Sequence, residues 1–89
     1  TPWLNVNHEP SSKKTVLEIQ CTDQLGLVYQ FANAITQQGF NIIFSRMSIE
    51  YGEVVTIFQI NKNNSDETTT AKDLIALRES INKIIEIKK

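Results

Sequence analysis

Residues 23–28 combine an acidic side chain, a glycine and backbone amides in a way that suits anion binding. In sequence order they are Asp23-Gln24-Leu25-Gly26-Leu27-Val28. They connect a run typical of a strand to a run typical of a helix, and such a turn leaves unpaired N–H groups at the helix N-terminus. A carboxylate could bind there. Asp23 could equally cap the helix and Gly26 serve packing alone, so a ligand site and a structural turn both remain open.

Side chains for catalysis or metal binding are sparse. His8 is the only histidine and Cys21 the only cysteine, so the sequence predicts no internal disulfide and no Cys-x-x-Cys motif. The serines lack the sequence context of a catalytic nucleophile, and no glycine-rich phosphate loop is present. Asp66 and Glu67 are expected to be solvated. We therefore expect a non-catalytic domain with no metal and no cofactor.

Length and charge restrict the possible partners. The chain has 89 residues and a formal net charge of -1, which predicts one domain over residues 1–89. Its basic residues are scattered, so nucleic acid is not expected as a partner; Phe44 beside Arg46 is only a thin version of an RNA-binding strand. Apolar runs are too short for a membrane span, which favours a cytoplasmic location. The start at Thr1 suggests a domain excised from a larger protein.

The elements that would position the turn follow from hydrophobic periodicity. The sequence predicts strands at 2–6, 14–22, 41–50 and 54–60 and helices at 26–38 and from 70 to 85. Residues 8–12 are expected to form a loop. Gly39 suits the position after a helix end, and Thr69 or Thr70 can cap the second helix with Asp73 in its first turn.

Two helices with one apolar face each can cover only one side of a four-stranded sheet. The expected fold is an α+β, ferredoxin-like two-layer sandwich. Its inner face would hold Leu17, Ile19, Met47, Val54, Phe58 and Ile60. The opposite face would carry Val16, Phe44, Val55 and Ile57, which predicts an interface with a covering partner. Scattered surface apolar residues are the alternative.

The sequence resembles an ACT domain over most of its length. Residues 15–28 are similar to the strand, turn and helix that open such domains, and Gly39-Phe40-Asn41-Ile42 is similar to their link between first helix and second strand. Residues 49–53 and 57–60 resemble the hairpin and third strand. The leading segment Pro2-Trp3-Leu4-Asn5-Val6-Asn7 is similar to the repeats of PII uridylyltransferases and plant ACR proteins.

The resemblance implies a regulatory role. ACT domains pair and often bind an amino acid at the interface between two units, which here suggests control of an attached enzyme, such as a nucleotidyltransferase of nitrogen metabolism. Carried over by position, the ligand-binding residues would be Asp23, Gln24, Leu25, Gly26, Leu27 and Val28, faced by Asn41 and Ile42. The N-terminal strand would occupy the sheet position of a C-terminal one. A structural dimerisation module without ligand is the alternative function.

Overall fold

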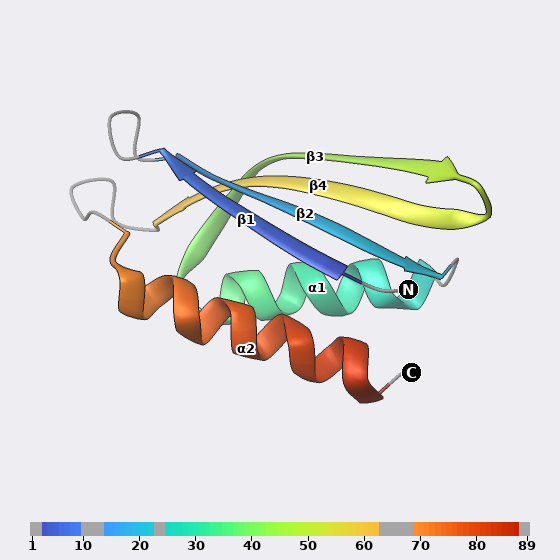
Figure 1. The fold of residues 1–89 in the computed structure, drawn as a ribbon. Helices are drawn as coiled ribbons and strands as arrows, with labels where there is room; N and C mark the ends of the chain where they lie inside the picture. Colours follow the sequence, from blue (N-terminus) through green and yellow to red (C-terminus); the bar gives the residue numbers. More distant parts are fainter. Residues whose placement is uncertain (1–2, 10–13, 23–24, 63–68, 88–89) are drawn as a thin grey trace.

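The chain folds into a four-stranded antiparallel sheet with two helices on one face (Figure 1). The computed structural model describes residues 3–9, 14–22, 25–62 and 69–87. In chain order the elements are β1 (Trp3–Glu9), β2 (Lys14–Thr22), α1 (Leu25–Gln37), β3 (Phe40–Glu50), β4 (Glu53–Lys62) and α2 (Ala71–Ile87). The predicted α+β sandwich is confirmed.

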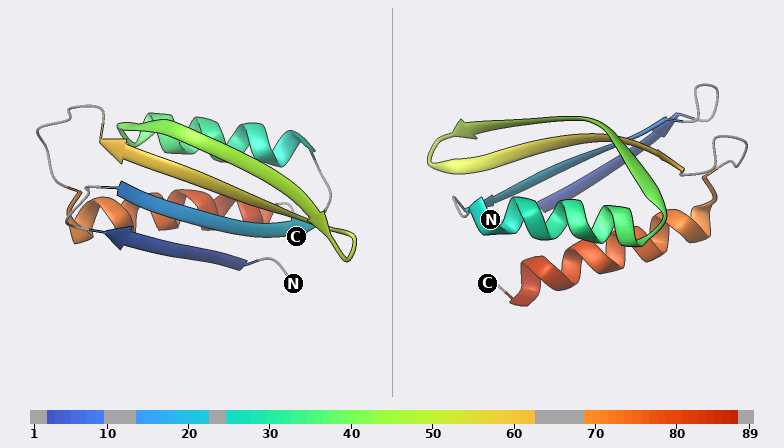
Figure 2. Two further views of the ribbon diagram at one scale, coloured as in Figure 1. Left: turned by 90° about the horizontal axis from the view of Figure 1, so that it is seen from above. Right: turned by 180° about the vertical axis from the view of Figure 1, so that it is seen from behind.

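The strands lie in the order β1-β2-β4-β3, so β1 and β3 form the two edges (Figure 2). β1 pairs with β2 along its whole length, from Trp3 opposite Gln20 to Glu9 opposite Lys14. The N-terminal strand therefore occupies the edge beside β2, as predicted. Within the described residues, no helix combines the length and apolar character needed to cross a membrane.

Glycines set the ends of two elements. Gly39 has a φ of 88° and follows α1, where the left-handed region costs glycine little. At the β3–β4 turn, Tyr51 (φ 53°) precedes Gly52 (φ 80°). Two consecutive positive φ values define a tight turn whose twist matches that of the paired strands. β3 and β4 are consequently antiparallel neighbours.

The core lies between the sheet and the helices. It contains buried side chains from β2, the start of β3, β4 and both helices, namely Leu17, Ile19, Cys21, Leu27, Phe31, Ile35, Phe40, Phe58, Ile60, Leu77 and Ile81. Alternation along β2 and β4 places every second side chain in this layer. Of the predicted inner-face residues, Leu17, Ile19, Val54, Phe58 and Ile60 are buried, as expected.

Met47 is the exception, because 46% of its surface is exposed. Its pairing with Thr56 places it on the inner side, as predicted, but the prediction of its burial was wrong. The β3–β4 hairpin rises away from the helices toward its turn, which leaves the inner side of its outer end uncovered (Figures 1 and 2). Sheet twist of this kind is a general property of β-sheets.

The end of β1 and the course of β3 also differ from prediction. His8 and Glu9 were expected in a loop, yet they belong to β1 because Thr15 and Lys14 pair with them. His8 Nδ1 lies 2.9 Å from Thr15 Oγ1, a hydrogen bond that joins the two strands. In β3 the register shifts between Ile42 and Phe44, so Ile43 is an extra residue in a bulge.

Candidate ligand and docking sites

The α1 N-terminus retains part of the predicted ligand turn. Asp23 and Gln24 lie outside the described residues, and α1 begins at Leu25. Gly26 is exposed, and a Cβ built there would meet nothing within 4 Å. The first helical turn contains no acidic side chain. Backbone N–H groups next to open space can hold a carboxylate, since the first N–H groups of a helix have no partner within it.

Two other residues of this turn serve the core. Leu27 is only 3% exposed and belongs to the buried cluster, while the half-buried Val28 packs against it. Their side chains therefore anchor the helix start. Among Gly26, Leu27 and Val28, the part left for a ligand is therefore the backbone.

Asn41 and Ile42 lie at the opposite end of α1. Gly39 leads directly from the C-terminal end of the helix into β3, so the start of β3 is adjacent to that end. The 13 residues of α1 span about 20 Å at about 1.5 Å each. Within one chain, the structure does not bring Asn41 and Ile42 to the turn. The predicted helix over residues 26–38 already implied this separation, which the assignment by motif did not take into account.

The predicted interface residues lie on the sheet face that no described helix covers. Val16 and Phe44 occupy one row across the strands, with Gln59 between them. Val16 is 38% and Phe44 52% exposed, and Ile57 is half-buried. Val55 differs, because only 6% of it is exposed. It lies between Gln20 and Ser48 and adds little area to this surface.

A side-chain hydrogen bond lies at one end of the same sheet face. Gln20 Nε2 donates to Glu53 Oε2 at 2.8 Å, joining β2 to β4. This bond holds the pKa of the Glu53 carboxyl below its ordinary value, since it favours the charged form. The pair fixes the register of the two central strands near the hairpin turn.

A groove between the two helices was not predicted. It has a volume of about 310 Å³ and lies on the α1 and α2 surfaces. Its lining includes Gln30, Asn33 and Gln37 from α1, with Ser80 and Lys83 from α2. Gln38 bridges the helices by donating from Nε2 to Ser80 Oγ at 3.0 Å. The recurrence of amides along one side of α1 was the available sequence signal.

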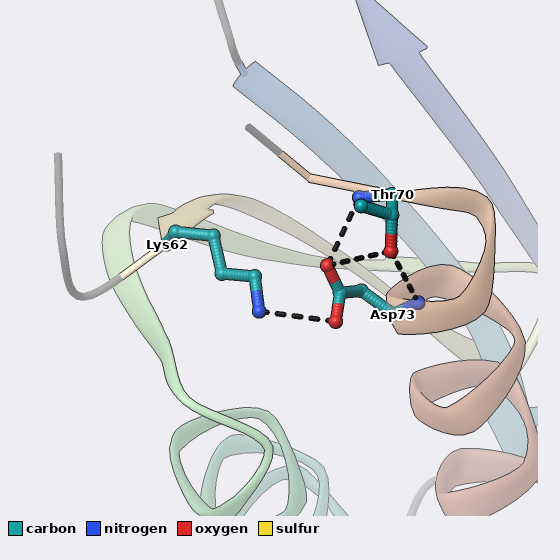
Figure 3. A network of polar contacts seen from close by, with 3 residues as sticks. All are labelled: Lys62, Thr70 and Asp73. Atoms are coloured by element: carbon teal, nitrogen blue, oxygen red, sulfur yellow. Dashed lines mark hydrogen bonds and ion pairs between the residues drawn. The ribbon is translucent and has the colours of Figure 1, made fainter. Parts of the chain in front are cut away.

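A network at the start of α2 is structural (Figure 3). Thr70 Oγ1 accepts the Asp73 N–H at 3.2 Å, and the Thr70 N–H donates to Asp73 Oδ2 at 2.9 Å. This reciprocal arrangement is a capping box and confirms the predicted cap at Thr70. Lys62 Nζ lies 3.1 Å from Asp73 Oδ1 and 5.3 Å from the centre of the Phe40 ring. The network ties the end of β4 to α2.

Hydrogen bonding also lowers the pKa of the Asp73 carboxyl. The bond from the Thr70 backbone N–H is the main reason that the pKa of Asp73 lies below its ordinary value, and Lys62 adds to the effect. Among the residues with described positions, no group of three or more His, Cys, Asp or Glu side chains is arranged to hold a metal ion.

Known proteins support the fold without identifying a family. No protein family matches the sequence, and no curated protein matches it either. A crystal structure of an unknown protein from Galdieria sulphuraria is similar, with a TM-score of 0.57 and 21% sequence identity. The similarity covers 75% of this chain and 37% of that chain. Fold and comparison together define a small ferredoxin-like α+β domain that is compatible with an ACT-like arrangement.

Proposed function

We propose that this chain is a non-catalytic, ACT-like regulatory domain that binds a small amino acid between two such domains and controls an attached enzyme. The α1 N-terminus supports the proposal most directly. Gly26 is exposed with open space at its Cβ position, beside the first backbone N–H groups of the helix. The ligand carboxylate would accept hydrogen bonds from this turn.

Pairing would convert binding into regulation. A ligand held between two domains binds the paired state more tightly than the separate one, and it shifts the equilibrium by that difference. The attached enzyme would sense the shift. The resemblance to domains of PII uridylyltransferases favours a nucleotidyltransferase of nitrogen metabolism as that enzyme.

A panel of the twenty amino acids, measured by calorimetry and thermal shift, tests the proposal. A ligand present at a hundred times its Kd should stabilise the folded state by about 2.7 kcal/mol. The absence of binding to a sample of confirmed dimers would contradict the ligand-binding function.

Gly26→Ala locates the site. Because the new Cβ meets nothing in the chain, the variant should fold and gain about 0.5–1 kcal/mol of stability from the better helix former. The methyl group would nevertheless occupy the space beside the N–H groups and weaken ligand binding. Gln30→Ala is the matched control, an exposed α1 residue that lines the interhelical groove. Binding lost in Gln30→Ala and retained in Gly26→Ala would move the site to the groove.

A structural dimerisation module without ligand is the second candidate. The exposure of Val16 and Phe44 on the uncovered sheet face favours it. Phe44→Glu should then abolish the dimer, while the amino-acid panel gives no binding. Dimers in wild type together with a silent panel would favour this function over the first.

A further inference from the structure

The exposed side of α1 carries no charge, whereas that of α2 does. None of the residues from Leu25 to Gln37 is acidic or basic. The exposed polar positions of α1 are amides and a hydroxyl, namely Gln30, Asn33, Thr36 and Gln37. Those of α2 include Lys72, Arg78, Glu79 and Lys83. A surface helix usually presents charged as well as neutral polar residues to water, so α1 differs from an ordinary solvated helix.

Three of these α1 side chains line one wall of the interhelical groove. Gln30, Asn33 and Gln37 follow one another at helical spacing on that wall. The groove volume of about 310 Å³ falls within the range of small-molecule sites. Lys83 is the charged residue of the lining, and Ile84 adds apolar surface. No acidic side chain is among the described residues that line the groove.

The antiparallel course of the two helices brings Lys83 to the wall opposite these amides (Figure 1). Gln38 and Ser80 are hydrogen-bonded, so these two positions lie side by side. One turn forward along α2 then matches one turn back along α1, which brings Lys83 beside the turn that contains Asn33. The row of amides is about 10 Å long, at about 1.5 Å per residue. The groove thus has amides along one wall and one ammonium group on the other.

The polar groups of these walls are not used within the described part of the chain. The three α1 amides make no side-chain hydrogen bond to another described residue, and Lys83 makes no ion pair with one. Ser80 is different, because its hydroxyl donates to the Ala76 carbonyl at 3.1 Å and accepts from Gln38. This hydroxyl holds the helices together, and the amides and Lys83 are left to meet a ligand.

We propose that the interhelical groove binds a sugar acid, a molecule with several hydroxyl groups and one carboxylate. A primary amide both donates and accepts hydrogen bonds, as a hydroxyl does, so a row of amides matches a row of hydroxyls. Lys83 supplies one positive charge for the one carboxylate. Ala34 and Ile84 would contact the C–H groups of the carbon chain. Gluconate has this composition.

The same lining disfavours two other classes of small molecule. An amino acid carries an ammonium group, which would find no carboxylate among the described residues of the groove. A phosphorylated sugar or a nucleotide brings about two negative charges or more to a single lysine. The sugar-acid site therefore differs in ligand and in place from the amino-acid site proposed at the α1 N-terminus, and it does not depend on that site.

Calorimetry with three related probes tests the class of ligand. Gluconate should bind. Sorbitol lacks the carboxylate and should have an affinity lower by about tenfold or more, the usual value of one charged hydrogen bond. Glucosaminate, in which an ammonium group replaces one hydroxyl of gluconate, should also bind more weakly than gluconate. The absence of gluconate binding, or equal binding of gluconate and either other probe, would overturn the proposal.

Substitutions in the lining locate the binding. Lys83→Met removes the charge but keeps a long unbranched side chain, and it should lower the affinity for gluconate by about tenfold or more, to that for sorbitol. Gln37→Leu should weaken the binding of gluconate and sorbitol alike. Lys72→Met, at an exposed α2 position outside the groove, is the matched control and should change neither. Equal gluconate binding by wild type and Lys83→Met would contradict the site.

Gly26→Ala separates the two proposed sites. Gluconate binding should be unchanged in this variant, because Gly26 does not line the groove. Gluconate binding that is lost in Gly26→Ala and retained in Lys83→Met would place the carboxylate at the α1 N-terminus and overturn the groove site. The amino-acid panel is measured with different ligands, so a silent panel would contradict the proposed function and leave the sugar-acid site standing.

Discussion

β1 and β3 are both edges of one sheet, but their side chains have different surroundings. Along β1, half-buried and exposed residues alternate, and Leu4 and Val6 pack against the core. Along β3, exposure is continuous after Ile42. α2 contacts β1 along the sheet, whereas the outer end of β3 rises away from α1 (Figures 1 and 2). Helix coverage, more than position at an edge, therefore decides which apolar side chains the fold buries.

Proline substitution at adjacent β3 positions should give the largest effect. Backbone bonding alternates along β3 from the Glu50–Glu53 pair beside the turn, so the Ser48 N–H bonds to β4 and the Met47 N–H does not. Ser48→Pro removes that bond and should lower the free energy of unfolding by up to about 3 kcal/mol. Met47→Pro removes an N–H that faces the open edge and should cost less than about 1 kcal/mol. Urea unfolding of monomeric samples measures both. Equal losses would show that the outer edge of β3 is not free.

Alanine substitution at the two ends of one row of inner side chains should give the next largest difference in stability between the two edges. Leu4, Ile19, Thr56 and Met47 follow one another across the strands. Leu4→Ala should cost about 2 kcal/mol because it opens space beside the core. Met47→Ala should cost less than about 1 kcal/mol, because much of its side chain is already in water. A larger loss for Met47→Ala than for Leu4→Ala in urea unfolding would contradict this difference between the edges.

Asp73→Asn provides a reference away from both edges. The amide oxygen can still accept the Thr70 N–H, but loss of the charge removes the ion pair with Lys62 and the favourable interaction with the helix N-terminus, which should lower stability by about 1 kcal/mol without changing self-association. The folded pKa of Asp73 lies below its unfolded value of about 3.9. Its contribution is therefore complete above the unfolded value and is lost as pH falls through the folded one. The difference between wild type and variant should shrink in acid, as urea unfolding at several pH values would show.

Tyr51→Asn should give the smallest effect and the opposite sign. Tyr51 has a positive φ and is fully exposed, so it gains nothing from packing while it pays for a disfavoured backbone conformation. Asn-Gly suits this turn, and the variant should be more stable by about 0.5–1 kcal/mol. Thermal unfolding tests it. A loss of stability would indicate that Tyr51 contacts something in the folded protein.

Periodicity and turn residues predicted most of the fold from the sequence. The bounds of β2, the helix end before Gly39 and the Thr70 cap follow from local chemistry and are confirmed. The exposure of Met47 was not predictable in this way. An alternating pattern assigns a residue to a face, but it does not tell which strand is at the edge or where twist lifts that strand from a helix.

The candidate site was less accessible to prediction. Gly26 lies at the helix start as predicted, because the strand-to-helix change marks such a turn, but the sequence left open whether it would be exposed or packed against a neighbour. Asn41 was assigned to the ligand site by its place in a family motif, but the length of α1 separates it from the turn at the helix N-terminus. The interhelical groove depends on how α1 packs beside α2, which single-helix patterns do not contain.

The position of β1 also affects the order in which the sheet can assemble. β1 and β2 are paired from Glu9 and Lys14, which are close in sequence, and β3 and β4 are paired from the two residues that flank their turn. Only β2 and β4 join distant segments, such as Thr15 with Ile60. A fourth strand from the C-terminal end would add a second long-range pairing. Because closing long loops slows folding, both hairpins should form early here and their docking should be the slow step.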